Sequence, residues 1–148
     1  IKSNNPENGL SASYYEINPT CSLPRFDQLQ PKSVTNVQEI NVNAVSHRDN
    51  YFALHFKGFL KIDEDDTYTF FVRSDDGSVL SIGDHVLIDN DGCHGIREKA
   101  ATVFLKKGIH PVSVGYLQND GGAFLNVLYK SSKLPLQIIP PQVLFMKL

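Results

Sequence analysis

Apolar and polar residues alternate with a period of two along most of this sequence, and this alternation constrains the fold more than any other feature. The segment 51–62 places Phe52, Leu54 and Phe56 on one face and His55 and Lys57 on the other. Such a pattern is typical of a β-strand with one face in the core. Similar segments follow at spacings of about 8 to 12 residues, centred on 67–73, 80–82, 86–88, 101–105, 112–116 and 125–129.

Turn-forming residues separate these segments. The acidic run 63–66 predicts a turn that joins 51–62 to 67–73 as a β-hairpin. The polar region 24–45 is expected to hold an irregular strand and a long connection. The last extended segment, 134–145, contains three prolines, which predict a position at a sheet edge because proline lacks the backbone donor. No long segment has a helical period, so the sequence predicts an antiparallel sandwich or barrel.

Composition excludes several classes of protein. The 16 acidic and 14 basic residues give a net charge of -2, which does not favour a binder of nucleic acid or anionic membranes. No apolar run approaches the roughly 18 to 20 residues of a membrane helix, so no membrane insertion is expected. The length of 148 residues suits one domain. Cys21 and Cys93 could form a disulfide or remain two buried thiols.

Sequence motifs of common enzymes are absent. There is no His-Glu-x-x-His, no Gly-x-Ser-x-Gly, no phosphate-binding loop and no Cys-x-x-Cys. A glycosidase needs only two suitably separated carboxylates, and sequence alone does not reveal such a pair. Most acidic residues here lie beside glycine or in clusters, however, where turns and solvated edges explain them. We therefore expect a non-catalytic module.

The most informative motif is Ser74-Asp75-Asp76-Gly77-Ser78, between two strong strand segments. A hairpin turn is one interpretation, since Asp-Gly is a common tight-turn pair. A calcium site is the other, because calcium takes six to eight oxygen ligands, often carboxylates and backbone carbonyls together. A cis peptide between Asp75 and Asp76 would bring both carboxylates onto one ion.

Two further polar loops could take part. The loop 118–123 offers the side-chain oxygen of Asn119, and its glycines allow backbone carbonyls to turn inward; a flexible hairpin loop is the simpler interpretation. The loop 89–95 does not fit an EF-hand, because Gly92 comes too early and Ala100 stands where the final Glu is needed. It is expected to form a wide turn at the rim of a binding site.

An ordered set of short motifs resembles the PA14 domain family over roughly residues 9–145. The set comprises 9–16, 51–60, 68–83, 86–92, 105–110 and 122–129. The resemblance implies a PA14-like fold, an all-β, antiparallel two-sheet β-sandwich, over a single domain of residues 1–148. Members occur in bacterial glycoside hydrolases, in adhesins and in a toxin's protective antigen.

The resemblance also implies a site. In sugar-binding members an Asp-Asp pair joined by a cis peptide holds Ca²⁺, which coordinates two sugar hydroxyls; the matching pair here is Asp75 and Asp76. The implied metal ligands are Asp75, Asp76, Asn119 and the backbone carbonyls of Gly121 and Ala123. The implied ligand-binding residues are Asp75, Asp76, Asn90, Asp91, His94, Asn119 and Asp120. Specificity is expected from the loops 90–94 and 118–123.

These features predict a calcium-dependent carbohydrate-binding module. The absence of Trp agrees with this, because many sugar-binding modules depend on a Trp platform, whereas a calcium site does not. The module is expected to be an accessory domain of a larger secreted carbohydrate-active enzyme or adhesin, with an extracellular, cell-surface or periplasmic location. The alternative is a structural or docking domain that shapes a neighbouring catalytic domain without binding sugar itself.

Overall fold

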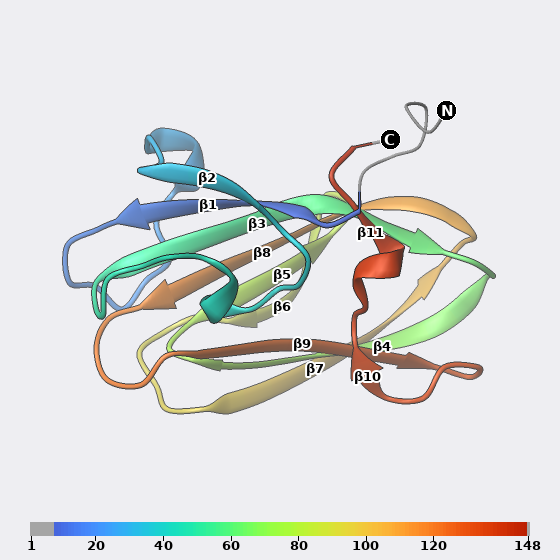
Figure 1. Cartoon of the computed structure of the whole chain (residues 1–148). Helices are drawn as coiled ribbons and strands as arrows, with labels where there is room; N and C mark the ends of the chain where they lie inside the picture. Colours follow the sequence, from blue (N-terminus) through green and yellow to red (C-terminus); the bar gives the residue numbers. More distant parts are fainter. Residues whose placement is uncertain (1–7, 148) are drawn as a thin grey trace.

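The computed structural model describes residues 8–147 and consists of two antiparallel β-sheets packed face to face (Figure 1). The larger sheet has the order β2-β1-β3-β8-β5-β6, with β11 paired to β3, and the smaller has the order β10-β9-β4-β7. The strands of the larger sheet are β1 (Leu10–Glu16), β2 (Ser33–Val37), β3 (Phe52–Ile62), β5 (Ser78–Ile82), β6 (His85–Asn90), β8 (Gly108–Gln118) and β11 (Leu144–Phe145). Those of the smaller sheet are β4 (Asp66–Asp75), β7 (Arg97–Leu105), β9 (Phe124–Ser131) and β10 (Gln137–Ile138). The predicted two-sheet sandwich is confirmed.

The core lies between the sheets, where the alternating residues of both meet. From the larger sheet come Phe52, Phe56 and Tyr116, and from the smaller come Phe70 and Val72, all almost fully buried. Burial of one such side chain stabilises the fold by about 1.5–3 kcal/mol. The period of two therefore identified the inward face of the main strands correctly.

The connections differ from the sequence prediction in one respect. The pair 51–62 and 67–73 was predicted to be a hairpin, but β3 lies in the larger sheet and β4 in the smaller. That prediction is wrong, because apolar alternation shows which face of a strand is buried without showing which neighbour completes its ladder. The β5–β6 connection at Gly83 is a tight hairpin of this kind, with the glycine at a positive φ of 63°.

The long segment between β1 and β2 covers the outer face of the larger sheet. We call residues 17–32 the disulfide loop, because Cys21 is bonded to Cys93. Phe26, in the 3₁₀ turn η1 (Phe26–Gln28), stacks on His55 of β3 with 4.3 Å between ring centroids. Gly115 of β8 permits this approach, since a Cβ there would meet a Phe26 ring carbon at 3.0 Å. The end of β8 is consequently buried on both faces.

The remaining predictions about the chain are largely confirmed. The region 24–45 holds an edge strand, β2, and a long connection with two 3₁₀ turns, η1 and η2 (Val42–Ala44). The segment 134–145 is not one extended piece: β10 pairs with the smaller sheet, η3 (Pro141–Val143) turns the chain, and β11 pairs with the larger. β10 lies at the edge of the smaller sheet, as the prolines indicated, whereas β11 has β3 on one side and a bridge between Phe145 and Asn8 on the other. No helix within residues 8–147 is long and apolar enough to cross a membrane.

The packing of Phe26 on His55 should change the pKa of the His55 ring. Burial under Phe26, with a smaller effect of Lys57, lowers the pKa of His55 to about 4. A histidine held neutral in the fold contributes stability that is complete above its unfolded pKa near 6.5 and is lost as the pH falls toward 4. We expect the free energy of unfolding to fall by up to about 1.4 kcal/mol per pH unit across this range.

The measurement is denaturant unfolding between pH 7 and pH 4, with the His55 ring followed by NMR. Phe26→Ala should move the His55 pKa toward 6.5 and flatten the pH dependence of stability. Phe59→Ala on the same strand, away from the ring stack, is the matched control. A His55 that titrates near 6.5 in the wild type would contradict the described packing.

Candidate functional site

Three connections between the two sheets meet at one end of the sandwich, on the left in Figure 1. They are 75–77 between β4 and β5, 91–96 between β6 and β7, and 119–123 between β8 and β9. The strand register brings these ends together, because Ser78 lies opposite both Asn90 and Tyr116, and Asp75 lies opposite Phe124. Neither 75–77 nor 119–123 is a hairpin loop, so the simpler interpretations of these motifs do not hold.

The Asp76 carboxylate joins the three connections. One of its oxygens accepts a hydrogen bond from the backbone N–H of Asn119 at 2.8 Å, and the other accepts one from the backbone N–H of His94 at 3.1 Å. Asp76 is only 5% exposed. A buried carboxylate held by two backbone donors is fixed in position, and its remaining lone pairs are available to a further partner.

Asp75 lies beside it across a cis peptide bond. The hydroxyl of Tyr116 donates to the Asp75 carbonyl at 2.5 Å, and a Cβ at Gly122 would lie 3.6 Å from the Asp75 carboxylate. The Asp75 side chain therefore faces the 119–123 loop. Burial raises the pKa of the Asp75 carboxyl, and the neighbouring Asp76 carboxylate raises it further.

Two carboxylates held together in this way favour a cation. No Lys or Arg within residues 8–147 forms an ion pair with either of them. The described residues bring no three His, Cys, Asp or Glu side chains together as a metal-binding group, so amide and carbonyl oxygens would have to complete a site. The Asn119 side chain and the exposed backbone of 121–123 supply oxygens of this kind, which suit a hard cation such as calcium.

Asn119 and Gly121 already make contacts within the protein. The Asn119 side-chain oxygen accepts from the Thr20 N–H at 3.1 Å, and the Gly121 carbonyl accepts from the Gln118 side-chain amide at 2.9 Å. Each contact uses one of the two lone pairs of its acceptor oxygen and helps to order the loop. Ala123 is exposed beside them, at the start of β9.

A network of buried polar side chains holds the Asp75–Asp76 segment in place. The Ser74 hydroxyl donates to the Asp76 carbonyl at 2.8 Å and lies 2.6 Å from the Ser78 hydroxyl. The Asn90 amide donates to Ser74 at 3.2 Å and accepts from Arg97 at 2.8 Å. Asn90 was predicted to contact ligand, yet it is fully buried and its side-chain oxygen and nitrogen both have protein partners. Its observed contacts are those of a supporting residue.

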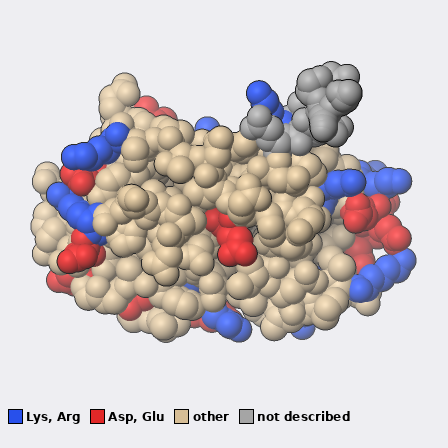
Figure 2. All heavy atoms as spheres, in the orientation of Figure 1, with Lys and Arg blue, Asp and Glu red and all other residues tan. Residues whose placement is uncertain are grey.

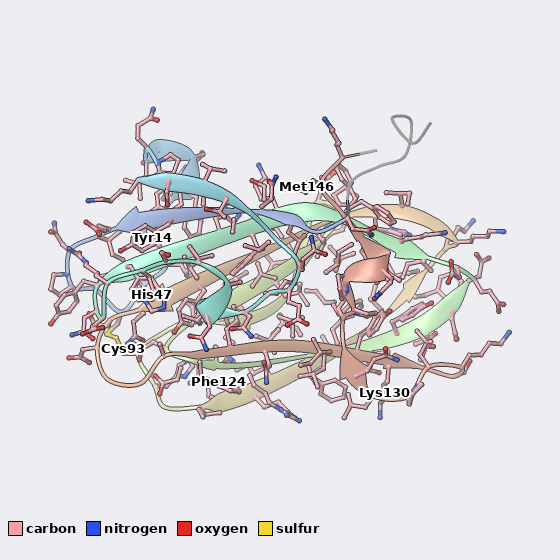
Figure 3. The ribbon with its side chains drawn as sticks, viewed as in Figure 1. Tyr14, His47, Cys93, Phe124, Lys130 and Met146 are labelled. Atoms are coloured by element: carbon pink, nitrogen blue, oxygen red, sulfur yellow. A yellow bond between two sulfur atoms is a disulfide. The ribbon has the colours of Figure 1, made fainter. Side chains whose placement is uncertain are left out.

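The other predicted ligand-binding residues are distributed around the carboxylates. The Asp91 side chain accepts from the Leu23 N–H at 3.1 Å and so anchors the disulfide loop. His94 is half-buried, and its two ring nitrogens lie 2.7 Å from the Gly95 carbonyl and 2.9 Å from the Asn90 carbonyl. Asp120 is exposed. Figure 3 places the Cys93 disulfide at this same end of the sandwich.

Several residues that shape the site gave no recognisable signal in the sequence. Tyr116 reads as an ordinary core residue, although its hydroxyl positions Asp75. Thr20 lies 99 residues from Asn119 in the chain. Tyr51 adopts a positive φ of 59°, rare for a bulky residue, and its N–H donates to the Asn119 carbonyl at 2.9 Å. In the sequence, the possible Cys21–Cys93 disulfide was the one indication that residues near Thr20 could lie close to the Asp76 end of the sandwich.

Comparison with known families identifies the chain. The model of the PA14 domain matches residues 6–142, and the chain belongs to this family. No curated protein matched the sequence.

Solved structures with the same fold include binding proteins. An anti-sigma factor domain-containing protein superposes with a TM-score of 0.83 at 22% identity over 97% of this chain, which spans 49% of that protein's length. A PA14 sugar-binding domain from an RTX adhesin has a TM-score of 0.79 at 16% identity, covering 95% of this chain and 99% of its own. The epithelial adhesin 6 A domain from Candida glabrata, in complex with Galβ1-3GlcNAc, has a TM-score of 0.68 at 14% identity, covering 97% and 88%.

Gly77 should be irreplaceable in the Asp-Asp segment. A Cβ at Gly77 would lie 2.7 Å from the Asp91 carboxylate and 2.7 Å from the Gly92 backbone nitrogen. Since backbone atoms cannot move aside cheaply, Gly77→Ala should destabilise the fold by about 1–3 kcal/mol and displace the 91–96 loop. Denaturant unfolding measures this. Gly95→Ala, where a Cβ meets nothing within 4 Å, is the matched control; equal stability of the two variants would contradict the close approach.

Proposed function

We propose that this PA14 domain is a calcium-dependent carbohydrate-binding module whose centre is Asp75, Asp76 and Asn119. The observation that carries the proposal is the Asp76 carboxylate, which is buried, held by the N–H groups of Asn119 and His94, and placed beside Asp75. Neither carboxylate forms an ion pair with a Lys or Arg among the described residues. Pairing of a buried carboxylate is the usual compensation for its desolvation. A bound cation would provide it here.

The oxygens that would hold the ion come from two of the three connections. They are the carboxylates of Asp75 and Asp76, the side-chain oxygen of Asn119 and the carbonyls of Gly121 and Ala123. Calcium in such a set supplies a fixed positive charge that sugar hydroxyls can ligate in place of water. The raised pKa of Asp75 supports this assignment, because a cation would stabilise the charged form that burial and Asp76 disfavour.

Side chains around the centre would orient the sugar. Asp75 and Asp76 can each accept a hydrogen bond from a sugar hydroxyl, since carboxylates carry several acceptor positions. Asp120 is exposed on the 119–123 loop and can add another acceptor, while half-buried His94 borders the opposite side. Asn90 and Asp91 would act indirectly, by holding the 91–96 connection and the disulfide loop in place.

We further propose that the domain is an accessory part of a larger extracellular, cell-surface or periplasmic protein and is itself non-catalytic. The disulfide between Cys21 and Cys93 supports this location, because structural disulfides persist in oxidising compartments. The accessory role is supported by the anti-sigma factor domain-containing protein, of which this chain spans 49%, and by the RTX adhesin, of which the similar structure is one domain.

A second candidate function is a structural or docking domain without a sugar site. The observation that favours it is the completeness of the internal network: Thr20 already occupies the Asn119 side-chain oxygen, and Gln118 the Gly121 carbonyl. The three connections would then be ordered by protein contacts alone. The two candidates differ in whether calcium and sugar bind at all.

Calcium binding is tested by calorimetric titration of chelator-treated protein. We expect one saturable site in the wild type, lost in Asp75→Asn and in Asp76→Asn because each removes a charged ligand. At about 100 times its dissociation constant, calcium should stabilise the wild type by about 2.7 kcal/mol. Asp84→Asn makes the same charge change at the exposed β5–β6 turn and is the matched control. No saturable heat in the wild type would favour the structural candidate.

Sugar binding is tested on a glycan panel with calcium, with chelator and with magnesium. We expect binding that needs calcium, that disappears in Asp76→Asn, and that Asp120→Asn weakens without changing calcium affinity. Glycan binding that persists in the presence of chelator would contradict the calcium mechanism but would still support a carbohydrate-binding function. If calcium binds but no glycan of the panel does, the structural role is the remaining candidate.

A further inference from the structure

The opposite end of the sandwich contains a cavity that the proposed site does not use. Its volume is about 280 Å³, and it opens where the chain passes from β9 through β10 and η3 back to β11. Apolar walls come from Ile62, Leu134, Pro140 and Val143, and polar groups from the β3–β4 turn and from the ends of β4 and β9. In Figure 2 acidic and basic side chains gather together at the right-hand end of the molecule, where these connections lie.

Two buried tyrosines reach this cavity with their hydroxyl groups. Tyr68 is 5% exposed and Tyr129 is 3% exposed. Their rings pack against each other at 6.0 Å between centroids, and each also packs against Phe70. Neither hydroxyl has a hydrogen-bond partner within residues 8–147, and no fully buried side-chain oxygen there is unpaired. Both hydroxyls are therefore accessible from the cavity that the two residues line.

The charges around the cavity favour a cation over an anion. Lys133 pairs with Glu64 at 2.5 Å and Lys61 lies 3.8 Å from Asp63. These two lysines face three carboxylates in the lining, those of Asp63, Glu64 and Asp66, so the cavity has a net negative charge. The Asp66 carboxylate has only neutral donors, the Ser132 hydroxyl and the Thr67 N–H, which lower its pKa. Asp66 forms no ion pair within residues 8–147, although Lys133 is near enough to interact with its charge. Burial raises the pKa of Tyr129 to about 12, so both ring hydroxyls stay protonated and can accept from a donor as well as donate.

We propose that this cavity is a second ligand site, for a small organic cation of the alkylammonium class. The head group would donate hydrogen bonds to the Tyr68 and Tyr129 hydroxyls near the Asp66 carboxylate, and the alkyl body would contact Ile62, Leu134 and Val143. The cavity lies near the lower limit of small-molecule pockets, roughly 300 Å³, so the ligand has few heavy atoms. A ligand that binds by ring stacking is disfavoured, because the faces of both tyrosines are covered in the core.

The test uses three probes with the same alkyl body and different head groups: n-butylammonium, 1-butanol and butyrate. Each is titrated into the full chain, followed by the NMR methyl signals of Ile62, Leu134 and Val143. We expect saturable shifts with butylammonium, and binding of the other two weaker by about tenfold or more, because a hydrogen bond to a charged group is worth roughly 1.5–3 kcal/mol.

Tyr68→Phe and Tyr129→Phe each keep the ring and remove one hydroxyl. Each should weaken butylammonium binding about tenfold, and since the two variants are read separately, one that folds is sufficient. Tyr15→Phe, a buried tyrosine packed on Phe26 in the larger sheet, is the matched control and should bind as the wild type does. Absence of saturable shifts, equal binding of the three probes, or binding unchanged in both variants would each overturn the proposal.

Discussion

The Asp76 carboxylate is the point on which the geometry of the candidate site depends. Its own connection joins β4 to β5, and its two oxygens receive N–H groups from the connections that follow β6 and β8. A short acidic side chain thereby fixes three loops that are far apart in sequence. Each of these loops changes sheets, and the Tyr116–Asp75 and Asn90–Ser74 hydrogen bonds add to the contacts of Asp76 in holding them together.

The support behind this carboxylate is unusual for a surface loop, because it is polar and buried. Ser74, Ser78 and Asn90 are fully buried and bonded to one another or to nearby backbone. Buried polar groups are costly unless each is satisfied, and a fully satisfied network specifies one arrangement. The disulfide loop adds a second support from outside, through Thr20, Leu23 and the Cys21–Cys93 bond. The carboxylates are thus held rigidly between a buried network and a tethered loop.

The two ends of the sandwich differ in the chemistry of their side chains. At the end with Asp76, all three strand-to-strand connections cross between sheets and bring backbone amides and carbonyls together. At the other end the β3–β4 and β7–β8 connections also cross between the sheets, as does the final segment through Pro140 and η3, and a cavity there is lined by Tyr68 and Tyr129. The ligand proposed for the first end is a hard cation held by oxygens, and the ligand proposed for the second is an organic cation held by hydroxyls and apolar walls.

The sequence predicted the fold class and the inward faces well, because alternation in segments such as 51–62 reports burial directly. It failed for the β3–β4 pairing, since a turn signal at 63–66 does not tell a hairpin from a crossing between sheets. It placed Asp75, Asp76 and Asn119 in one site through family resemblance, and the structure brings these three together. The supporting roles of Asn90, Tyr116 and Thr20 depend on contacts distant in sequence, which no local pattern encodes.

A crystal structure of the chain grown with calcium and a bound disaccharide would test the central claim most directly. The account predicts one ion with oxygens of Asp75, Asp76 and Asn119 at about 2.3–2.6 Å, and two hydroxyls of one sugar ring on the same ion. An ion elsewhere, or a sugar that binds away from these three residues, would contradict it.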